Sequence, residues 1–125
     1  RMSYSQAPRE RKWKASEHGE GCEATVEEGG WCSEPALWVH WTHRGTMVAK
    51  DHSELIGVSV DMFRTAMQRS LANTAFCSRY AQLFVNFLNE HREQVNDVWC
   101  DQDQLRDMAL DASQDADAAA LADEG

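Results

Sequence analysis

The sequence lacks any apolar run long enough to cross a bilayer, which takes about 20 consecutive apolar residues. It also lacks a charged segment followed by an apolar one near residue 1, so we expect no secretory leader. These absences favour a cytoplasmic protein that does not enter a membrane. Thiols stay reduced in that compartment, so free thiols or metal ligands are expected rather than disulfides. The cysteines concerned are Cys22, Cys32, Cys77 and Cys100.

Basic residues are scarce in the last third of the chain. Residues 90–125 hold eleven acidic and two basic side chains, whereas residues 1–89 hold ten of each, so the whole formal net charge of −9 lies in the C-terminal part. A domain that binds nucleic acid generally presents a basic face to the phosphates. The charge therefore argues against nucleic acid as the partner and favours a protein with a basic surface.

Glycine and proline are both missing between residues 59 and 95. Apolar and small residues recur there at steps of three and four, which places them on one stripe of an α-helix. The stripe consists of Val60, Phe63, Met67, Leu71, Thr74, Cys77, Ala81, Phe84 and Leu88. We predict one long amphipathic helix, capped at Ser59 or Asp61, with two helices broken near residues 73–74 as the alternative. So much apolar surface on one helix predicts self-association into a homodimer.

Turn residues divide residues 21–52, where β structure is expected. Residues 29–30 (Gly-Gly) can supply the positive φ of a reversal, and residues 44–45 separate the strand-like runs ALWVHWTH and TMVAKDH. The first run is rich in aromatic and branched residues, which favour strands. A two-residue turn between the runs would set the register of a hairpin in which Leu37 faces His52.

The two ends of the chain lack periodic apolar residues. Residues 1–20 predict a disordered basic arm. Residues 101–112 suggest a short acidic helix with a thin apolar stripe, and residues 113–125 predict an acidic disordered tail. We therefore expect an α+β fold with one domain over residues 21–95, in which a small antiparallel hairpin sheet packs on the long helix. An accessory helix within residues 96–112 follows it.

Cysteines and histidines gather around the expected hairpin. Thiolates and neutral imidazoles suit Zn²⁺, which accepts both in a tetrahedral site. The candidate ligands are Cys22, Cys32 and His52, with His18, His40, His43 or Cys77 as the fourth. The C-x9-C spacing is wider than the C-x2-C of a compact knuckle. A disulfide between Cys22 and Cys32 is the alternative in an oxidising compartment.

Residues 22–52 resemble the small treble-clef zinc fingers. Cys32 is followed by a Pro-Ala pair, an aromatic strand, a hairpin and a histidine before a helix, as in those fingers. The resemblance covers about thirty of the 125 residues. Treble-clef fingers close with C-x2-H, and Ala49 stands where that cysteine would precede His52. The resemblance implies either a finger without metal or a zinc site completed from elsewhere in the chain.

Nothing in the sequence resembles a nucleophile elbow, a phosphate-binding loop or an HExxH helix. His40 and His43 would point to opposite faces of a strand, so they cannot act as one pair. The remaining acid–base candidate is His52 with Asp51 or Glu54, because a carboxylate can orient a histidine as a base near neutral pH. We expect no catalysis and keep a small histidine-dependent enzyme as an alternative.

Tryptophans on the expected hairpin point to recognition. Aromatic residues concentrate binding energy at interfaces, so Trp31, Trp38 and Trp41, together with His40, are the expected contact residues. We predict a non-catalytic protein–protein interaction module, an adaptor or an inhibitor that regulates another protein. The alternative is a zinc-stabilised finger that binds a protein partner or nucleic acid, with zinc as the one expected cofactor.

Overall fold

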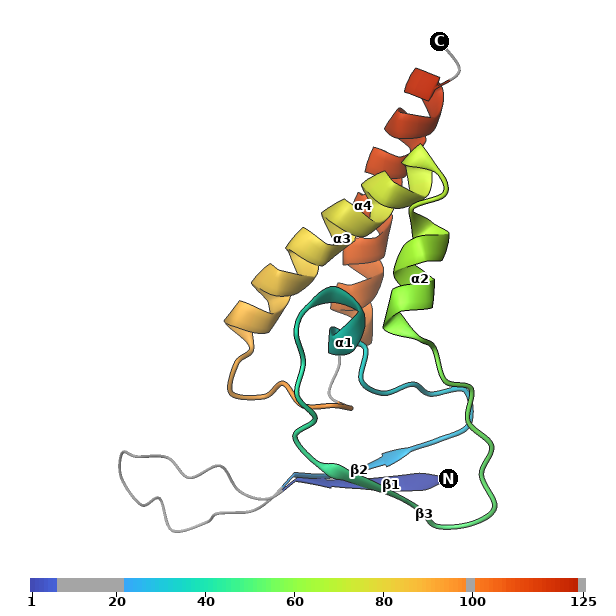
Figure 1. Ribbon diagram of the computed structural model, residues 1–125. Helices are drawn as coiled ribbons and strands as arrows, with labels where there is room; N and C mark the ends of the chain where they lie inside the picture. Colours follow the sequence, from blue (N-terminus) through green and yellow to red (C-terminus); the bar gives the residue numbers. More distant parts are fainter. Residues whose placement is uncertain (7–21, 99–100, 124–125) are drawn as a thin grey trace.

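The chain folds into a three-stranded antiparallel sheet and a set of helices, which confirms the predicted α+β class. The computed structural model describes residues 1–6, 22–98 and 101–123. The elements are β1 (Met2–Gln6), β2 (Cys22–Val26), α1 (Pro35–Trp38), β3 (Thr46–Ala49), α2 (Val60–Met67), α3 (Leu71–Glu90) and α4 (Gln102–Asp123). Figure 1 shows the sheet at one end of the molecule and α2, α3 and α4 rising from it as a second layer.

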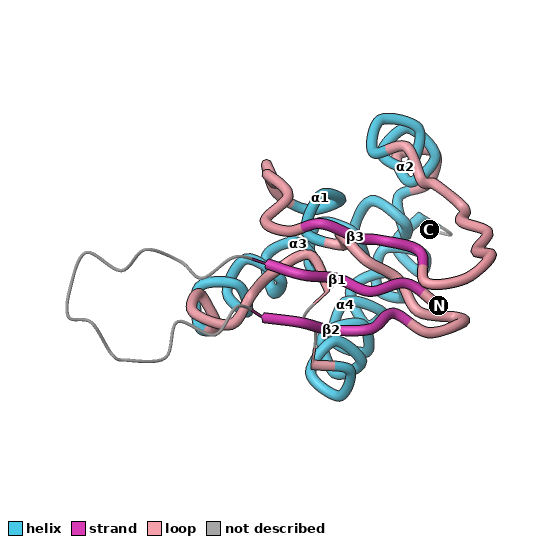
Figure 2. Tube along the Cα trace, turned by 90° about the horizontal axis from the view of Figure 1, so that it is seen from below, coloured by secondary structure: helices cyan, strands magenta, loops and turns pink. Residues whose placement is uncertain are grey.

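The sheet has the strand order β2-β1-β3, with β1 in the centre (Figure 2). Tyr4 of β1 lies opposite Ala24 on one side and Met47 on the other. The prediction of a hairpin between residues 37–43 and 46–52 is wrong. Pro35 instead starts a short helix, where the fixed φ of proline suits the first turn. This removes residues 35–38 from any strand, and β3 pairs with β1.

The strand β1 lies in the segment that was expected to be a disordered arm. That prediction is wrong for Met2–Gln6, and the rest of the arm, residues 7–20, lies outside the described residues. The side chain of Tyr4 is 1% exposed, and its burial supplies the apolar contact that a short polar strand otherwise lacks. β1 is therefore the strand that holds β2 and β3 together.

The predicted long helix is two helices. α2 ends at Met67, and Ser70 begins α3 by accepting a hydrogen bond from the backbone of Asn73 (3.0 Å) on its side-chain oxygen. Ser59 caps α2 in the same way, as expected. A serine cap satisfies a backbone N–H that has no partner inside the helix. The break therefore falls at residues 68–70, a few residues before the position that the alternative prediction gave.

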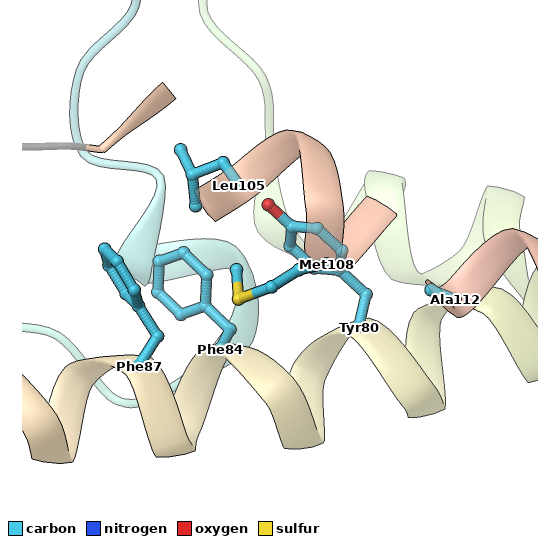
Figure 3. Close-up of a cluster of buried hydrophobic side chains, with 6 residues drawn as sticks. All are labelled: Tyr80, Phe84, Phe87, Leu105, Met108 and Ala112. Atoms are coloured by element: carbon cyan, nitrogen blue, oxygen red, sulfur yellow. The ribbon is translucent and has the colours of Figure 1, made fainter. Parts of the chain in front are cut away.

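The main apolar core lies between α3 and α4 (Figure 3). It consists of Tyr80, Phe84 and Phe87 from α3 and of Leu105, Met108 and Ala112 from α4. Ala112 is completely buried, so its small side chain lets the two helices approach closely. This core covers the C-terminal half of the predicted stripe, where Phe84 is buried and Leu88 is half-buried. Leu71 stays 61% exposed, so a dimer joined through the helices remains a prediction.

Helix α4 is longer than the predicted accessory helix of residues 96–112. It continues to Asp123, so the prediction of a disordered tail over residues 113–125 is wrong as far as that residue. Alanine has the highest helix propensity, which explains why an alanine-rich acidic segment continues the helix. Arg79 of α3 donates two hydrogen bonds of 3.2 Å to the carboxylate of Asp111 in α4. Within the described ranges, no helix combines the length and apolar character that crossing a bilayer requires.

Candidate functional site

Asp97, in the loop between α3 and α4, connects the sheet layer to the helical layer. Its side chain is 4% exposed and accepts hydrogen bonds from the Tyr4 hydroxyl (2.8 Å), the Trp41 indole (2.7 Å) and the His43 imidazole (3.1 Å). The backbone amides of residues 44 and 45 donate two more, at 2.7 and 3.0 Å. One carboxylate therefore holds β1 and the loop that leads into β3 against the end of α3.

The charge of Asp97 is stabilised where it lies. Burial raises the pKa of this carboxyl, but the hydrogen bonds from Trp41, Tyr4 and His43 outweigh burial and leave the pKa below its usual value. An ionised carboxylate only accepts hydrogen bonds, so the Nδ1 atom of His43 carries the proton of their bond. The Ser33 hydroxyl lies 3.4 Å from that same Nδ1 atom. A serine nucleophile would need the other ring nitrogen, so these three side chains do not form a hydrolase triad.

A second carboxylate, Glu34, accepts hydrogen bonds from two further tryptophans and a tyrosine. It accepts hydrogen bonds from the indoles of Trp31 (3.0 Å) and Trp38 (3.3 Å) and from the hydroxyl of Tyr80 (2.9 Å). Burial, with Glu34 beside it, raises the pKa of the Tyr80 phenol. The ring of Trp38 lies 4.8 Å from that of Tyr80, against the α3–α4 core. Trp38 therefore stabilises the core, whereas Trp31 is 51% exposed, so its role as a contact residue stays a prediction.

A group of highly exposed apolar side chains lies in the loop between β3 and α2 and in the first turn of α2. Ile56 is 97% exposed and Leu55 is 72% exposed, and Val58 and Met62 are exposed as well. In Figure 1 the loop of residues 50–59 bulges away from the body of the molecule between the sheet and α2. Large apolar side chains that are exposed this close together in the sequence are typical of a site of interaction. We call Leu55, Ile56, Val58 and Met62 the apolar loop surface.

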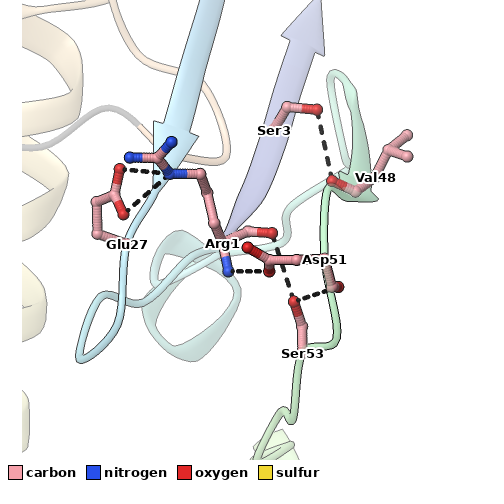
Figure 4. Close-up of polar contacts among 6 residues, drawn as sticks. All are labelled: Arg1, Ser3, Glu27, Val48, Asp51 and Ser53. Carbon is pink, nitrogen blue, oxygen red and sulfur yellow. Dashed lines mark hydrogen bonds and ion pairs between the residues drawn. The ribbon is translucent and has the colours of Figure 1, made fainter.

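The loop that carries this surface is attached only at its ends. At its start, the backbone N–H of Lys50 donates to Arg1 (3.1 Å), the amino group of Arg1 donates to Asp51 (2.8 Å), and the Ser53 hydroxyl donates to the Arg1 carbonyl (3.4 Å; Figure 4). At its end, Ser59 caps α2. Between these points, residues 55–58 make no hydrogen bond to any described part of the chain. Their backbone groups therefore remain available to a partner.

The short helix α2 offers more of the same surface. None of its residues is buried, and its main aromatic contact is an edge-to-face one between Phe63 and Trp38, at 5.8 Å between ring centroids. β3, which leads into the loop, is an edge strand. The N–H of Lys50 bonds to Arg1, so alternation along the strand turns the N–H and C=O groups of Met47 and Ala49 toward the open edge. An open edge can accept another strand.

The predicted zinc ligands that belong to the described residues do not lie together. Among residues 1–6, 22–98 and 101–123, no three metal-ligating side chains gather into a group that could hold an ion. Cys32 is an exposed free cysteine, and His52 lies exposed in the loop after β3. His18 and the side chain of Cys22 lie outside the described residues, so the zinc hypothesis stays a prediction. Burial raises the pKa of the Cys77 thiol, which is half-buried on α3.

The predicted acid–base pair is a loose surface contact. His52 Nε2 lies 3.9 Å from Glu54 Oε1, and both side chains are more than 90% exposed. Solvent screens a pair as exposed as this one, so the contact holds neither side chain in a fixed position. His40 is exposed and lines a groove together with Trp41, so these two predicted contact residues do share one surface.

No sequence pattern singles out the residues that organise the site. Asp97 and Glu34 each join aromatic residues from distant parts of the chain, and neither belongs to a motif. One signal could have found them: buried tryptophan and tyrosine require acceptors for their N–H and O–H groups. The indoles of the half-buried Trp38 and Trp41 therefore each need an acceptor, which Glu34 and Asp97 provide. Comparison of the chain with protein families, curated proteins and solved structures finds no match.

Proposed function

We propose that the protein is a non-catalytic protein–protein interaction module that regulates another protein, and that its partner adds a β-strand at the apolar loop surface. The observation that carries the proposal is the loop of residues 55–58, in which apolar side chains and unbonded backbone groups are exposed together. Burying one large aliphatic side chain contributes roughly 1.5–3 kcal/mol. Strand addition satisfies backbone groups and apolar side chains at the same time.

Charge selects the kind of strand. The acids Asp51, Glu54 and Asp61 lie on or beside this loop, and Lys50 is the one lysine or arginine between positions 50 and 61. The amino group of Arg1 pairs with Asp51, and the whole chain has a net charge of −9. An apolar strand with basic residues on its other face would complement both features. The proposed partner is therefore a protein that offers such a strand.

A short peptide of alternating valine and lysine provides the probe strand. We expect it to bind in isothermal titration calorimetry, and we expect the same peptide with alternate N-methylated amides to lose the binding. N-methylation removes the backbone donors but keeps the side chains. Equal binding of the two peptides would show that no strand is added and would contradict the proposal.

Side-chain variants test the location of the site. Replacing Leu55 and Ile56 together by serine should weaken peptide binding by about tenfold or more, because each loses a large aliphatic contact. The matched control is Leu121→Ser, at a leucine that is 71% exposed near the end of α4. If the control weakens binding as much as the double variant, the peptide does not bind at the loop.

Self-association remains a separate proposal, and the apolar loop surface offers a second place for it beside the exposed part of the helix stripe at Leu71. Light scattering at micromolar concentration distinguishes a mass of 14.2 kDa from twice that value. A dimer that Ile56→Ser dissociates would place the second copy on the apolar loop surface. A dimer that this substitution leaves intact would be joined elsewhere.

A further inference from the structure

A groove of about 420 Å³ lies between the segment that precedes β3 and the C-terminal part of α3. In Figure 1 the strand-like segment after α1 runs beside this end of α3. Apolar side chains from both segments line the groove: Val39, Val85, Leu88 and Val95. Its volume falls within the range of sites for small organic molecules, roughly 300–1,000 Å³. It shares no residue with the apolar loop surface.

Two residues that line the groove, Arg44 and Arg92, carry the charge sign opposite to that of the whole protein. Arg44 and Arg92 line it together with His40, and none of its lining residues is acidic. The whole chain carries 21 acidic and 12 basic side chains. A local group of bases in an acidic protein creates a positive potential that draws in anions. The groove therefore combines an apolar wall with a preference for negative charge.

Arg44 is held in place before any ligand arrives. Its guanidinium carbon lies 4.6 Å from the centre of the Trp41 ring, and its Nη1 atom donates to the carbonyl of Val95 (3.1 Å). Asp97 fixes both residues, because it accepts from the Trp41 indole and from the Arg44 backbone. A guanidinium has five N–H donors in a planar fork, so donors remain for a carboxylate after the bond to Val95. Such preorganisation lowers the entropic cost of binding.

We propose that this groove binds an organic acid, with the apolar body of the ligand between Val39 and Leu88 and its carboxylate on the Arg44 guanidinium. The carboxylate can belong to a free acid or to the C-terminus of an apolar peptide. The proposal goes beyond the interaction function, because it concerns another surface and another class of ligand.

Calorimetry with matched ligands tests the chemistry. Decanoate below its micelle concentration is the probe, and decanol, decylammonium and acetate are its controls. We expect decanoate to bind, decanol and decylammonium to bind at least about tenfold more weakly, and acetate not to bind at millimolar concentration. A hexapeptide of leucine and valine, with a free or an amidated C-terminus, distinguishes the two sources of the carboxylate. Stronger binding of the peptide with the free C-terminus than of the amidated peptide would show that the groove also binds C-terminal carboxylates.

Variants locate the binding. Arg44→Gln should weaken decanoate binding by about tenfold or more, because a charge-assisted bidentate hydrogen bond is lost. Arg44→Lys keeps the positive charge but loses the forked set of donors. Its affinity for decanoate should therefore lie between those of the wild type and Arg44→Gln. Arg92→Gln provides a second variant that does not touch the contacts of Asp97. The control is Arg69→Gln, at an exposed arginine between α2 and α3. Circular dichroism checks that each variant keeps its helices.

Three outcomes would overturn the proposal. The first is equal binding of decanoate and decanol, which would leave only an apolar contact. The second is binding of neither decanoate nor the free-acid peptide. The third is a loss of decanoate affinity in Arg69→Gln as large as in Arg44→Gln and Arg92→Gln. That result would show that the net charge of the protein, and not the groove, determines binding.

Discussion

The two layers of this protein are held together by different means. The helical layer has a continuous apolar core between α3 and α4, in which Phe84 contacts Trp38, Tyr80 and Phe87. The sheet buries one large side chain completely, Tyr4, and is fastened to the helices by the polar contacts of Asp97. Apolar burial is spread over many contacts, whereas a buried polar centre depends on one group. Single substitutions should therefore destabilise the two layers to different extents.

The largest expected loss of stability is in the helical layer. Phe84→Ala should lower the free energy of unfolding by about 3–5 kcal/mol, because it leaves a cavity beside Tyr80, Phe87 and Trp38. Urea unfolding followed by far-UV circular dichroism measures this loss. A loss below about 1 kcal/mol would show that the α3–α4 core is not closely packed.

The next largest loss belongs to the sheet. Asp97→Ala should cost roughly 3 kcal/mol, since five donors lose their buried acceptor. Asp107→Ala, at an exposed carboxylate of α4, is the matched control and should change stability by less than about 0.5 kcal/mol. If the two variants lose the same stability, Asp97 is not the connection between the layers.

Gly45 tests the close approach of the sheet to the Asp97 loop. A Cβ atom there would overlap the carbonyl oxygen of Ser5 and the ring of Tyr4. Gly45→Ala should therefore destabilise the protein by about 1–3 kcal/mol, the usual range for overpacking. Gly57→Ala is the control, because a Cβ at Gly57 meets no atom within 4 Å. A thermal melt that is unchanged in Gly45→Ala would contradict the packing of β1 on this loop.

The smallest predicted effect is a dependence on pH. The folded-state pKa of Asp97 is lowered, so its stabilising contribution is complete above the unfolded-state pKa near 3.8 and is lost as the pH falls through the folded-state pKa. The difference in unfolding free energy between the wild type and Asp97→Asn should therefore narrow as the pH falls below about 4. Denaturant titrations at several pH values measure it. A difference that stays constant down to the lowest pH would mean that the Asp97 charge does not contribute.

The sequence predicted the parts of the fold that follow from local pattern. The apolar stripe of residues 60–88 indicated helix correctly, and Ser59 was correctly proposed as a cap. A break between two helices was predicted only as the alternative and a few residues too late, because the apolar stripe and the helix propensity continue through residues 68–70. The side chain of Ser70 caps α3 there. The pairing of β3 with β1 was missed because it joins residues more than forty positions apart. A short polar strand carries no local pattern that indicates which distant strand it pairs with.

The site was less predictable than the fold. Trp41 and His40 were proposed as contact residues, and both line the groove beside α3. Trp38 was proposed with them, but it packs into the core. Asp97 carried no signal of its own, since it is one of 21 acidic residues. Only tertiary structure gathers its donors from residues 4, 41 and 43–45.

Native-state hydrogen exchange on Asp97→Asn tests most directly whether Asp97 connects two independently held layers. The amides of β1 and β3 should lose protection, because the substitution weakens the contacts to Tyr4, Trp41 and the backbone of the β3 loop. The amides of α3 and α4 should keep their protection, because their apolar core is untouched. An equal loss of protection in the sheet and in both helices would contradict this description of the molecule.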